Sequence, residues 1–351
     1  MVRAVEWSDG SSSGTSGAPG VRLIDQTLLP EREDHLHITT VDALVDAIRR
    51  LAVRGAPALG AAGALGVVVA MHEATREGWD EERLAAEVDR VRDARPTAVN
   101  LAWGVDRVRP LMASGPDAVL QEARRLIAED EAANRELSRL GADWILARTG
   151  RERVRVVTHC NTGALATTAW GTAYGIIHEL HDRGALGLVY ADETRPLLQG
   201  ARLTSWELTQ DGIEHVVQAD GAASSTILRG LVDVAIIGAD RITANGDTAN
   251  KVGSVALALA CQRAGIPFVV AAPSSTVDLA TATGDDIVIE ERDGKEVLAV
   301  GGVRSAPTGT RGFNPAFDVT PHDLVTAVVT ERGVAEPSAH PDPRLLESIA
   351  G

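Results

Sequence analysis

Cysteine and aromatic residues are scarce in this sequence. Only two cysteines, Cys160 and Cys261, occur in 351 residues, so we expect no disulfide framework and a reducing compartment. Aromatic residues make up 3% of the chain, which leaves few platforms on which single-stranded nucleic acid could stack. The 34 Lys and Arg against 49 Asp and Glu give a net charge of −15, which repels polyphosphate. We therefore expect no nucleic-acid partner, while a local basic pocket for one small phosphate stays open.

Long apolar segments are also missing. The longest apolar stretch, residues 56–71, is interrupted by glycine and proline and is shorter than the roughly 20 apolar residues that span a bilayer. The sequence MVRAVEWSDG at the N-terminus lacks the apolar run of a signal peptide. These absences predict a cytoplasmic protein with no membrane partner.

Nucleotide and metal motifs are absent as well. Neither GxGxxG nor GxxxxGK followed by Ser or Thr occurs, which weakens the case for a bound nucleotide. His178 and His181 share one helical face, but no third ligand has suitable spacing, so a zinc site is not expected. We predict no metal and no cofactor.

The length of the chain exceeds one average domain, and its patterns divide it into two. From residue 40 to 147 apolar residues recur at helical spacing, beginning at a helix that Thr39 or Thr40 caps. Glycines at 60, 63 and 66 give the second helix a small-residue face for close packing. This predicts a mainly helical N-terminal domain, residues 1–148, with a Ser/Gly-rich excursion at 9–20. Helices are expected at 41–51, after Pro57, and at 84–91, 97–108 and 119–146.

The pattern changes at Val154, where short β-rich runs alternate with helical stretches. The runs are nearly continuous in apolar residues, as in parallel strands covered on both faces. The predicted fold class is α/β, with a Rossmann-like, doubly wound parallel sheet in a C-terminal domain at residues 149–335. The tail, residues 336–351, begins proline-rich and is expected to be peripheral. Strands are expected at 154–158, 186–190, 214–218, 232–238, 266–271 and 286–290.

Polar and ionisable residues follow several of these strands. Ligands of an open parallel sheet bind beyond the carboxyl ends of its strands. Cys160 follows the first predicted strand, and Asp240 and then Lys251 follow the fourth. Their convergence on one edge of the sheet predicts the site.

Each of these residues has two interpretations. At a strand-to-helix junction, amide groups would lower the pKa of Cys160 and favour thiolate, but a free cysteine is also a small buried apolar residue. Asp240 is either a loop cap or a general acid whose pKa desolvation raises. Lys251 at a helix start would suit a phosphate, or it is a solvated lysine. Cys261 is expected to pack within a helix. Adjacent side chains at a strand end point to opposite faces, which argues against a Cys–His pair of His159 and Cys160.

Longer blocks of sequence carry a family resemblance. They keep one order from residue 24 to about residue 334, and they are IDQTLLP, VRGAPALG, RPTAVNL, THCNTGALA, ETRPLLQGARLT, GADR with NGDTANKVG, and NPAFDVTP. In these blocks the chain closely resembles methylthioribose-1-phosphate isomerases, which are aldose–ketose isomerases of methionine salvage. The departures are Thr162, where the family often has Ala, and the excursion at 9–20.

The resemblance implies a helical N-terminal domain on a Rossmann-like C-terminal domain, and a homodimer. It implies conversion of 5-methylthioribose 1-phosphate to 5-methylthioribulose 1-phosphate, with a small sugar phosphate as the partner. Cys160 and Asp240 would be the catalytic acid/base pair. The residues that would contact the sugar phosphate are Arg54, Gly55, Ala56, Arg95, Gln199, Asn250 and Lys251.

Two alternatives stay open, because the superfamily is broader than this activity. An isomerase of 5-deoxyribose 1-phosphate or ribose 1,5-bisphosphate would keep the chemistry and change the group at sugar C5. A non-catalytic subunit would resemble the regulatory subunits of a eukaryotic translation-initiation exchange factor, which generally lack the Cys/Asp pair.

Overall fold

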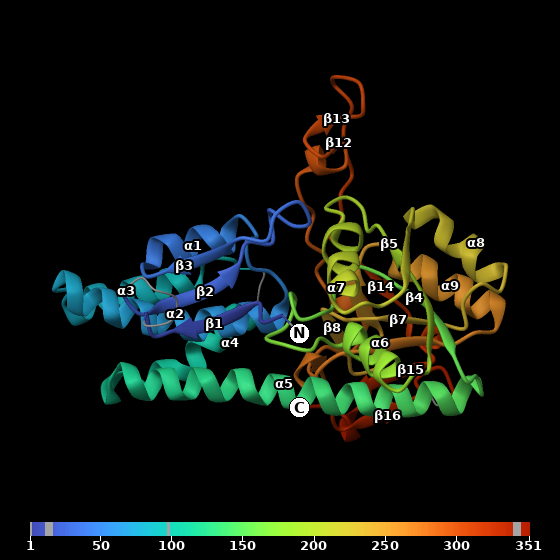
Figure 1. Ribbon diagram of the computed structural model, residues 1–351, viewed down its shortest axis with the longest axis horizontal. Coiled ribbons are helices and arrows are strands. Elements are labelled where there is room, and N and C mark those ends of the chain that lie inside the picture. Colours follow the sequence, from blue (N-terminus) through green and yellow to red (C-terminus); the bar gives the residue numbers. More distant parts are fainter. Residues whose placement is uncertain (1, 11–16, 97–98, 340–344) are drawn as a thin grey trace. The chain divides into compact units, whose positions relative to one another are not determined.

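The computed structural model describes residues 2–10, 17–96, 99–339 and 345–351 (Figure 1). The chain divides into two compact units, Met1–Ala132 with Gly163–Gly171, and Ala133–Thr162 with Thr172–Gly351. The division falls inside one long helix, whereas the change in sequence pattern comes later. The expected domains 1–148, 149–335 and 336–351 stay a prediction, and most of the excursion at 9–20 lies outside the described residues.

Helices and a small sheet make up the first unit. The sheet is antiparallel, with the order β1-β2-β3. The sequence pattern missed it, because its strands are only four or five residues long. The elements are β1 (Val5–Ser8), β2 (Gly20–Ile24), β3 (His35–Ile38), α1 (Val41–Arg49), α2 (Ala56–Glu77), α3 (Glu81–Arg92), α4 (Val99–Val108), the 3-10 helix η1 (Arg109–Ser114) and α5 (Pro116–Thr149).

The first two helices confirm the pattern that predicted them. Thr40 caps α1, and its side chain accepts a hydrogen bond from the Ala43 amide at 3.3 Å. The expectation that the apolar stretch is too short for a membrane was wrong, because α2 runs for 22 residues and is long and apolar enough to cross one. Of its most apolar window, 83% is buried within the structure, so α2 is a core helix.

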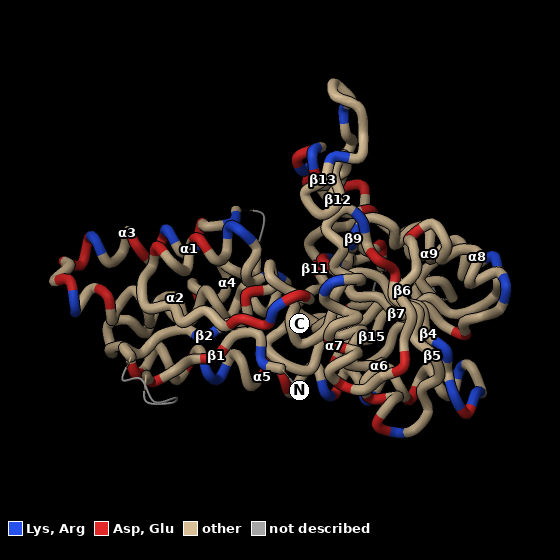
Figure 2. Tube along the Cα trace, turned by 45° about the horizontal axis from the view of Figure 1, so that its top comes forward, with Lys and Arg blue, Asp and Glu red and all other residues tan. Residues whose placement is uncertain are grey.

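Glycine allows α2 and α4 to pack closely. A Cβ on Gly104 would lie 2.0 Å from the carbonyl oxygen of Gly60, and one on Gly63 would lie 2.7 Å from that of Leu101. The predicted small-residue face is therefore confirmed. In Figure 2 charged positions alternate along α1 and α3, whereas most of α2 is uncharged.

A seven-stranded sheet forms the core of the second unit. Its order is β16-β15-β10-β7-β4-β5-β6, and every neighbouring pair is parallel except β15 with β16. The chain starts at β4, adds β5 and β6 on one side, and then returns to the other side of β4. This order confirms the predicted Rossmann-like fold. The strands are β4 (Val154–Thr158), β5 (Leu186–Asp192), β6 (His215–Gln218), β7 (Val234–Ile237), β10 (Phe268–Ala271), β15 (Ala327–Thr330) and β16 (Gly333–Ala335).

Helices cover both faces of this sheet. Val157 and Ile237 face one apolar cluster together with residues of α8 and α9, while Val156 and Ile236 face another with residues of α5 and α6. The helices are α6 (Ala173–Asp182), the π-helix η2 (Gly200–Thr204), α7 (Ser205–Gln210), α8 (Ala223–Leu228) and α9 (Ser254–Ala264). Short 3-10 turns are η3 (Asp220–Ala222), η4 (Ser274–Thr276), η5 (Gly284–Asp286), η6 (Gly294–Glu296), η7 (His322–Leu324) and η8 (Leu345–Ser348).

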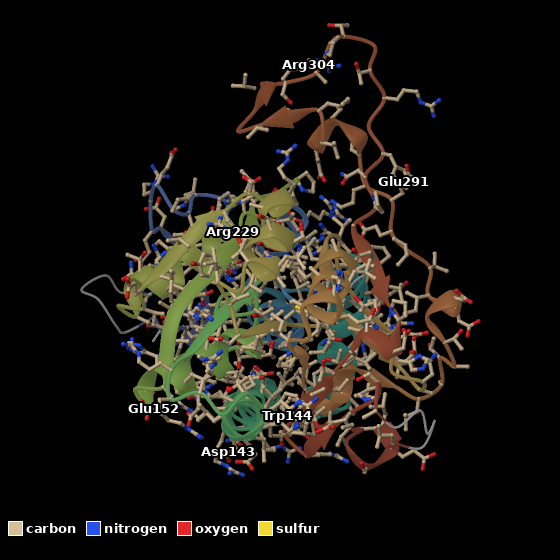
Figure 3. The ribbon with its side chains drawn as sticks, turned by 90° about the vertical axis from the view of Figure 1, so that its right-hand side faces the viewer. Asp143, Trp144, Glu152, Arg229, Glu291 and Arg304 are labelled. Atoms are coloured by element: carbon tan, nitrogen blue, oxygen red, sulfur yellow. The ribbon has the colours of Figure 1, made fainter. Side chains whose placement is uncertain are left out.

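A second, four-stranded sheet and an arm complete this unit. The sheet has the order β11-β8-β9-β14. The arm, residues 291–315, is closed at its base by a bridge between Glu291 and Pro315, and Figure 3 shows Glu291 on its stem and Arg304 near its tip. The strands are β8 (Arg241–Thr243), β9 (Thr248–Lys251), β11 (Val277–Asp278), β14 (Phe317–Thr320), and β12 (Ala299–Val300) with β13 (Val303–Arg304) in the arm.

Two expectations about the end of the chain were wrong. Residues 286–290 alternate like a strand but form none, because no neighbouring strand pairs with them, and Val288 is 95% exposed. The tail is not peripheral, since Leu346, Ile349 and Ala350 are buried in the apolar cluster of the second unit.

Candidate active site

The two predicted catalytic residues follow the two strands that flank the topological switch point. β4 and β7 are hydrogen-bonded neighbours, with Thr158 opposite Ile236. Cys160 lies just beyond the carboxyl end of β4, and Asp240 lies just beyond that of β7. A crevice at this point of a doubly wound sheet is where ligands bind. Positions 80 residues apart in sequence thus follow the carboxyl ends of neighbouring strands in the second unit.

We expected Cys160 to lie at a strand-to-helix junction, and this expectation was wrong. An irregular segment follows β4, and α6 begins only at Ala173. Cys160 is 8% exposed and has a left-handed backbone with φ of 65°. Its amide donates to Thr194 Oγ1 at 2.8 Å, and its carbonyl accepts from Thr204 Oγ1 at 2.6 Å. A left-handed conformation costs about 1–2 kcal/mol, and two hydrogen bonds worth about 0.5–1.5 kcal/mol each offset that cost.

Thr194, which holds the amide of Cys160, is itself held in place. It has a left-handed backbone with φ of 64°, and its hydroxyl donates to the Asp192 carbonyl at 3.0 Å. The Asp220 carboxylate accepts from the amides of Thr194 and Arg195 at 2.7 and 2.6 Å. Strained backbone of this kind concentrates at functional sites. The ends of β5 and of β6 therefore fix the turn that contacts Cys160.

His159 lies on the other side of the chain from Cys160. Nδ1 lies 3.0 Å from Asp192 Oδ2, and Nε2 lies 2.9 Å from the Val252 carbonyl oxygen. Because both neighbours can accept a hydrogen bond, a ring that carries two protons satisfies both of them and forms a buried ion pair with Asp192. Burial lowers the pKa of His159, but the hydrogen bond and charge of Asp192 outweigh burial and hold the pKa above its ordinary value. Both ring nitrogens of His159 thus have hydrogen-bond partners other than the Cys160 thiol, which agrees with the expectation that His159 does not pair with this thiol.

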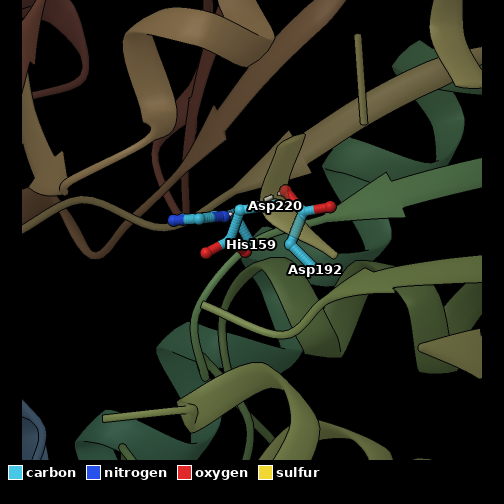
Figure 4. A group of neighbouring side chains, drawn as sticks. All are labelled: His159, Asp192 and Asp220. Carbon is cyan, nitrogen blue, oxygen red and sulfur yellow. Dashed lines mark hydrogen bonds and ion pairs between the residues drawn. The ribbon is translucent and has the colours of Figure 1, made fainter. Parts of the chain in front are cut away.

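His159, Asp192 and Asp220 each offer one ligand atom within 4.8 Å of the others, a grouping that could hold a metal ion (Figure 4). Hydrogen bonds already use these atoms. His159 pairs with Asp192, and both Asp220 oxygens accept backbone amides. We therefore interpret the group as a hydrogen-bonded cluster that shapes the site.

Asp240 is exposed, so the expected burial of its carboxyl group in an apolar pocket is not observed. Its backbone amide donates to the Ala249 carbonyl at 2.9 Å, which ties the loop after β7 to β9. The side chain is therefore on an accessible loop whose backbone is fixed.

Lys251 is the last residue of β9, whereas we expected it at the start of a helix. Its Nζ donates to the Ala316 carbonyl at 2.7 Å and lies 4.6 Å from the centre of the Phe317 ring. Lys251 also lies near the Glu296 carboxylate, and its charge helps to lower the pKa of that group. Lys251 is thus held at the end of β9, an inner strand of the second sheet.

Asp318 takes the place that we expected a phosphate to occupy. Its Oδ2 accepts from the amides of Gly253 and Val255, at 2.7 and 3.3 Å, at the start of α9. Burial raises the pKa of the Asp318 carboxyl group. The N-terminus of α9 is therefore capped by a carboxylate from β14.

Two further predicted ligands lie in the second unit. Gln199 is 7% exposed, and its Oε1 has no hydrogen-bond partner among the described residues. Asn250 is buried, and its Nδ2 donates to Ser254 Oγ at 2.9 Å. A buried amide oxygen without a partner is costly, so Gln199 is the more plausible of the two as a group awaiting a substrate hydroxyl.

The other predicted ligands belong to the first unit. Gly55 is the N-cap of α2 with φ of 97°, and a Cβ there would lie 2.1 Å from the Ala166 carbonyl oxygen. Only glycine fits this position. Arg54, Ala56 and Arg95 are half-buried.

The threonines that hold Cys160 were not assigned by the sequence analysis. Thr194 follows β5, so the rule that polar residues gather after strands could have found it. Thr204 had no such signal, because it ends the short π-helix η2 rather than a strand.

Comparison with known proteins identifies the family. A model of the initiation factor 2 subunit family matches residues 52–337. The chain is 52% identical over 341 residues to a Nocardia farcinica protein named "probable bifunctional methylthioribose-1-phosphate isomerase/methylthioribulose-1-phosphate dehydratase", covering 97% of this chain but spanning only 60% of that relative. It is 52% identical over 314 residues to a methylthioribose-1-phosphate isomerase of Anaeromyxobacter, covering 90% of each.

Solved structures agree with these relatives. A 5-methylthioribose 1-phosphate isomerase from Pyrococcus horikoshii is 38% identical with a TM-score of 0.87, covering 99% of this chain and 96% of that one. A structure from A. fulgidus described as the delta subunit of translation initiation factor eIF-2B is 39% identical with a TM-score of 0.86, covering 99% and 100%. The chain therefore belongs to the initiation factor 2 subunit family, and within it resembles the methylthioribose-1-phosphate isomerases over nearly its whole length.

Proposed function

We propose that this protein converts 5-methylthioribose 1-phosphate to 5-methylthioribulose 1-phosphate in methionine salvage. The observation that carries the proposal is the position of Cys160 and Asp240 at the ends of adjacent strands, on the two sides of the switch point. The names of full-length relatives about 50% identical support the same reaction.

The chemistry needs two proton-handling groups. A sugar whose anomeric oxygen carries phosphate does not open to a free aldehyde, so an acid must protonate the ring oxygen. Asp240, on an accessible loop, is the proposed acid, and it regains its proton from the C2 hydroxyl as the C2 carbonyl forms. Cys160 is the proposed base, which takes the proton from C2 and returns it to C1. A hydride shift from C2 to C1, with Cys160 only assisting, is the alternative route.

Positioning of the phosphate is the second requirement. Lys251 supplies a fixed cation, and Gln199 supplies an amide oxygen, to which no described residue donates a hydrogen bond, for a sugar hydroxyl. By the resemblance, the other contacts come from Asn250, Arg54, Gly55, Ala56 and Arg95. We propose that the reaction uses no cofactor or metal, and that the protein works as a cytoplasmic homodimer.

Substitution at the two catalytic positions tests the proposal. We expect Cys160→Ser and Asp240→Asn each to lower kcat by about 10²–10⁴-fold, the contribution of one general acid or base. Cys261→Ala should keep wild-type turnover, because Cys261 is buried in α9 and burial raises the pKa of its thiol to about 12. Near-wild-type turnover in either catalytic variant would remove that residue from the mechanism.

Two NMR measurements separate the alternatives. Purified protein is incubated with 5-methylthioribose 1-phosphate, 5-deoxyribose 1-phosphate and ribose 1,5-bisphosphate, and we expect the fastest ketose formation from the first. In deuterated water, deuterium at C1 of the product supports proton transfer. Turnover without deuterium fits either the hydride shift or a shielded Cys160 that returns the same proton. The likeness to the A. fulgidus structure makes a non-catalytic subunit the second candidate, which turnover of none of the three sugars would favour.

A further inference from the structure

We infer that Thr194 and Thr204 are positioning residues that aim the Cys160 thiol by clamping its backbone. The inference rests on the proposed function of Cys160 as the base. Neither threonine is part of the family's sugar-phosphate contacts named above, and neither needs to touch substrate to act.

The clamp consists of one hydrogen bond to the backbone amide of Cys160 and one to its backbone carbonyl. Thr194 Oγ1 accepts from the amide at 2.8 Å, and Thr204 Oγ1 donates to the carbonyl at 2.6 Å. One hydroxyl thus accepts a hydrogen bond from Cys160, and the other donates one to it. The threonines are 0% and 2% exposed, so water does not replace either hydroxyl when it is removed.

Each hydroxyl is anchored in turn. Thr194 Oγ1 also donates to the Asp192 carbonyl at 3.0 Å, which sets its proton toward Asp192 and its lone pair toward Cys160. Thr204 Oγ1 also accepts from Asn161 Nδ2 at 3.3 Å, which leaves its own proton for the Cys160 carbonyl. Both anchors lie in the second unit, so the clamp is complete within it.

The clamp matters because Cys160 is held in a conformation that a side chain rarely adopts. At φ of 65° the Cα–Cβ bond points in a direction that ordinary backbone would not give. If one peptide group is released, the residue can relax toward ordinary φ, and the sulfur moves away from the position at which it meets C2. A displacement of about 1 Å costs about 10²-fold in rate.

Isosteric substitutions remove the hydroxyls without changing shape. We expect Thr194→Val and Thr204→Val each to lower kcat by about 10²-fold with little change in KM, and Thr194→Ser to restore most of it. Thr326→Val is the matched control, since Thr326 Oγ1 also accepts a backbone amide, that of Phe268 at 3.0 Å, but at the amino end of β10. Its kcat should match wild type.

Thiol labelling gives a readout that does not depend on turnover. Iodoacetamide labelling followed by mass spectrometry reports both cysteines separately. We expect the Cys160 rate to rise about five- to tenfold in the two valine variants, the change that loss of one hydrogen bond produces, while Cys261 stays unlabelled. A merely structural role would expose Cys261 too.

Two results would overturn the inference. One is unchanged kcat and labelling in both valine variants, and the other is an equal loss of kcat in Thr194→Val and in the control Thr326→Val. If the wild-type protein turned over no sugar, the proposed function would fail by itself, and the labelling rates would still show whether the clamp holds Cys160.

Discussion

At the scale of single residues, the site depends on a buried ion pair that no local sequence pattern predicts. His159 and Asp192 are 1% exposed each, and Asp192 also accepts from Gln218 Nε2 at 2.9 Å. The pair joins the residue before Cys160 to the end of β5, and through the Val252 carbonyl to the segment that follows Lys251. It therefore fixes the orientation of three loops at the carboxyl edge.

This pair predicts a pH dependence of stability. Because Asp192 holds the pKa of His159 above its unfolded value of about 6.5, the contribution is complete below that pH and is lost as pH rises through the raised pKa. Asp192→Asn should lower the free energy of unfolding by about 3 kcal/mol at pH 6 and by less at pH 9. Urea denaturation at both pH values measures this. An equal loss at both would show that His159 does not titrate between pH 6 and pH 9 in the folded protein, which contradicts the predicted pH dependence.

At the scale of elements, the ends of the strands position the site, and contacts between helices stabilise the first unit. The order of the sheet follows from alternating strands and helices, and it places Cys160 and Asp240 beyond the ends of the neighbouring strands β4 and β7. The apolar pattern predicted most helices and central strands, but it also predicted a strand at 286–290, where pairing fails. Alternation shows that a segment could pair, whereas a neighbouring strand decides whether it does.

The close contact of α2 and α4 predicts a large effect from one methyl group. Gly104→Ala should lower the free energy of unfolding by about 1–3 kcal/mol or more, because its Cβ would overlap the Gly60 carbonyl and push the helices apart. Circular dichroism during thermal unfolding measures the resulting decrease in Tm. Gly221→Ala is the control, since a Cβ there meets no atom within 4 Å and should change little. A neutral Gly104→Ala variant would mean that the helices separate without cost.

At the scale of the whole molecule, a net charge of −15 makes the site's few cations matter. An anionic substrate is attracted only where cations outweigh the acidic surroundings locally. Lys251 is such a cation, fixed by the Ala316 carbonyl and the Phe317 ring.

Ligand-linked stability tests substrate choice on the intact protein. At about 100 times its Kd, 5-methylthioribulose 1-phosphate should stabilise the fold by about 2.7 kcal/mol, raising Tm by several degrees. Ribulose 1,5-bisphosphate at equal concentration should raise Tm less. Lys251→Met should reduce the shift, whereas Lys295→Met, whose side chain is 84% exposed, should not. A larger shift with the bisphosphate would contradict the proposed substrate.

The sequence by itself determined the fold class, most helices, the edge of the sheet where chemistry gathers, and the pair Cys160 and Asp240 as candidates. These depend on periodicity and on residues that follow strands, which are local properties. Only the tertiary structure shows how the backbone of Cys160 is held and that His159 pairs with Asp192. The partners in those contacts are 34, 44 and 33 residues away in sequence. Hydrogen bonds over such separations form only when folding brings strand ends together, because no local spacing specifies which hydroxyl meets which amide.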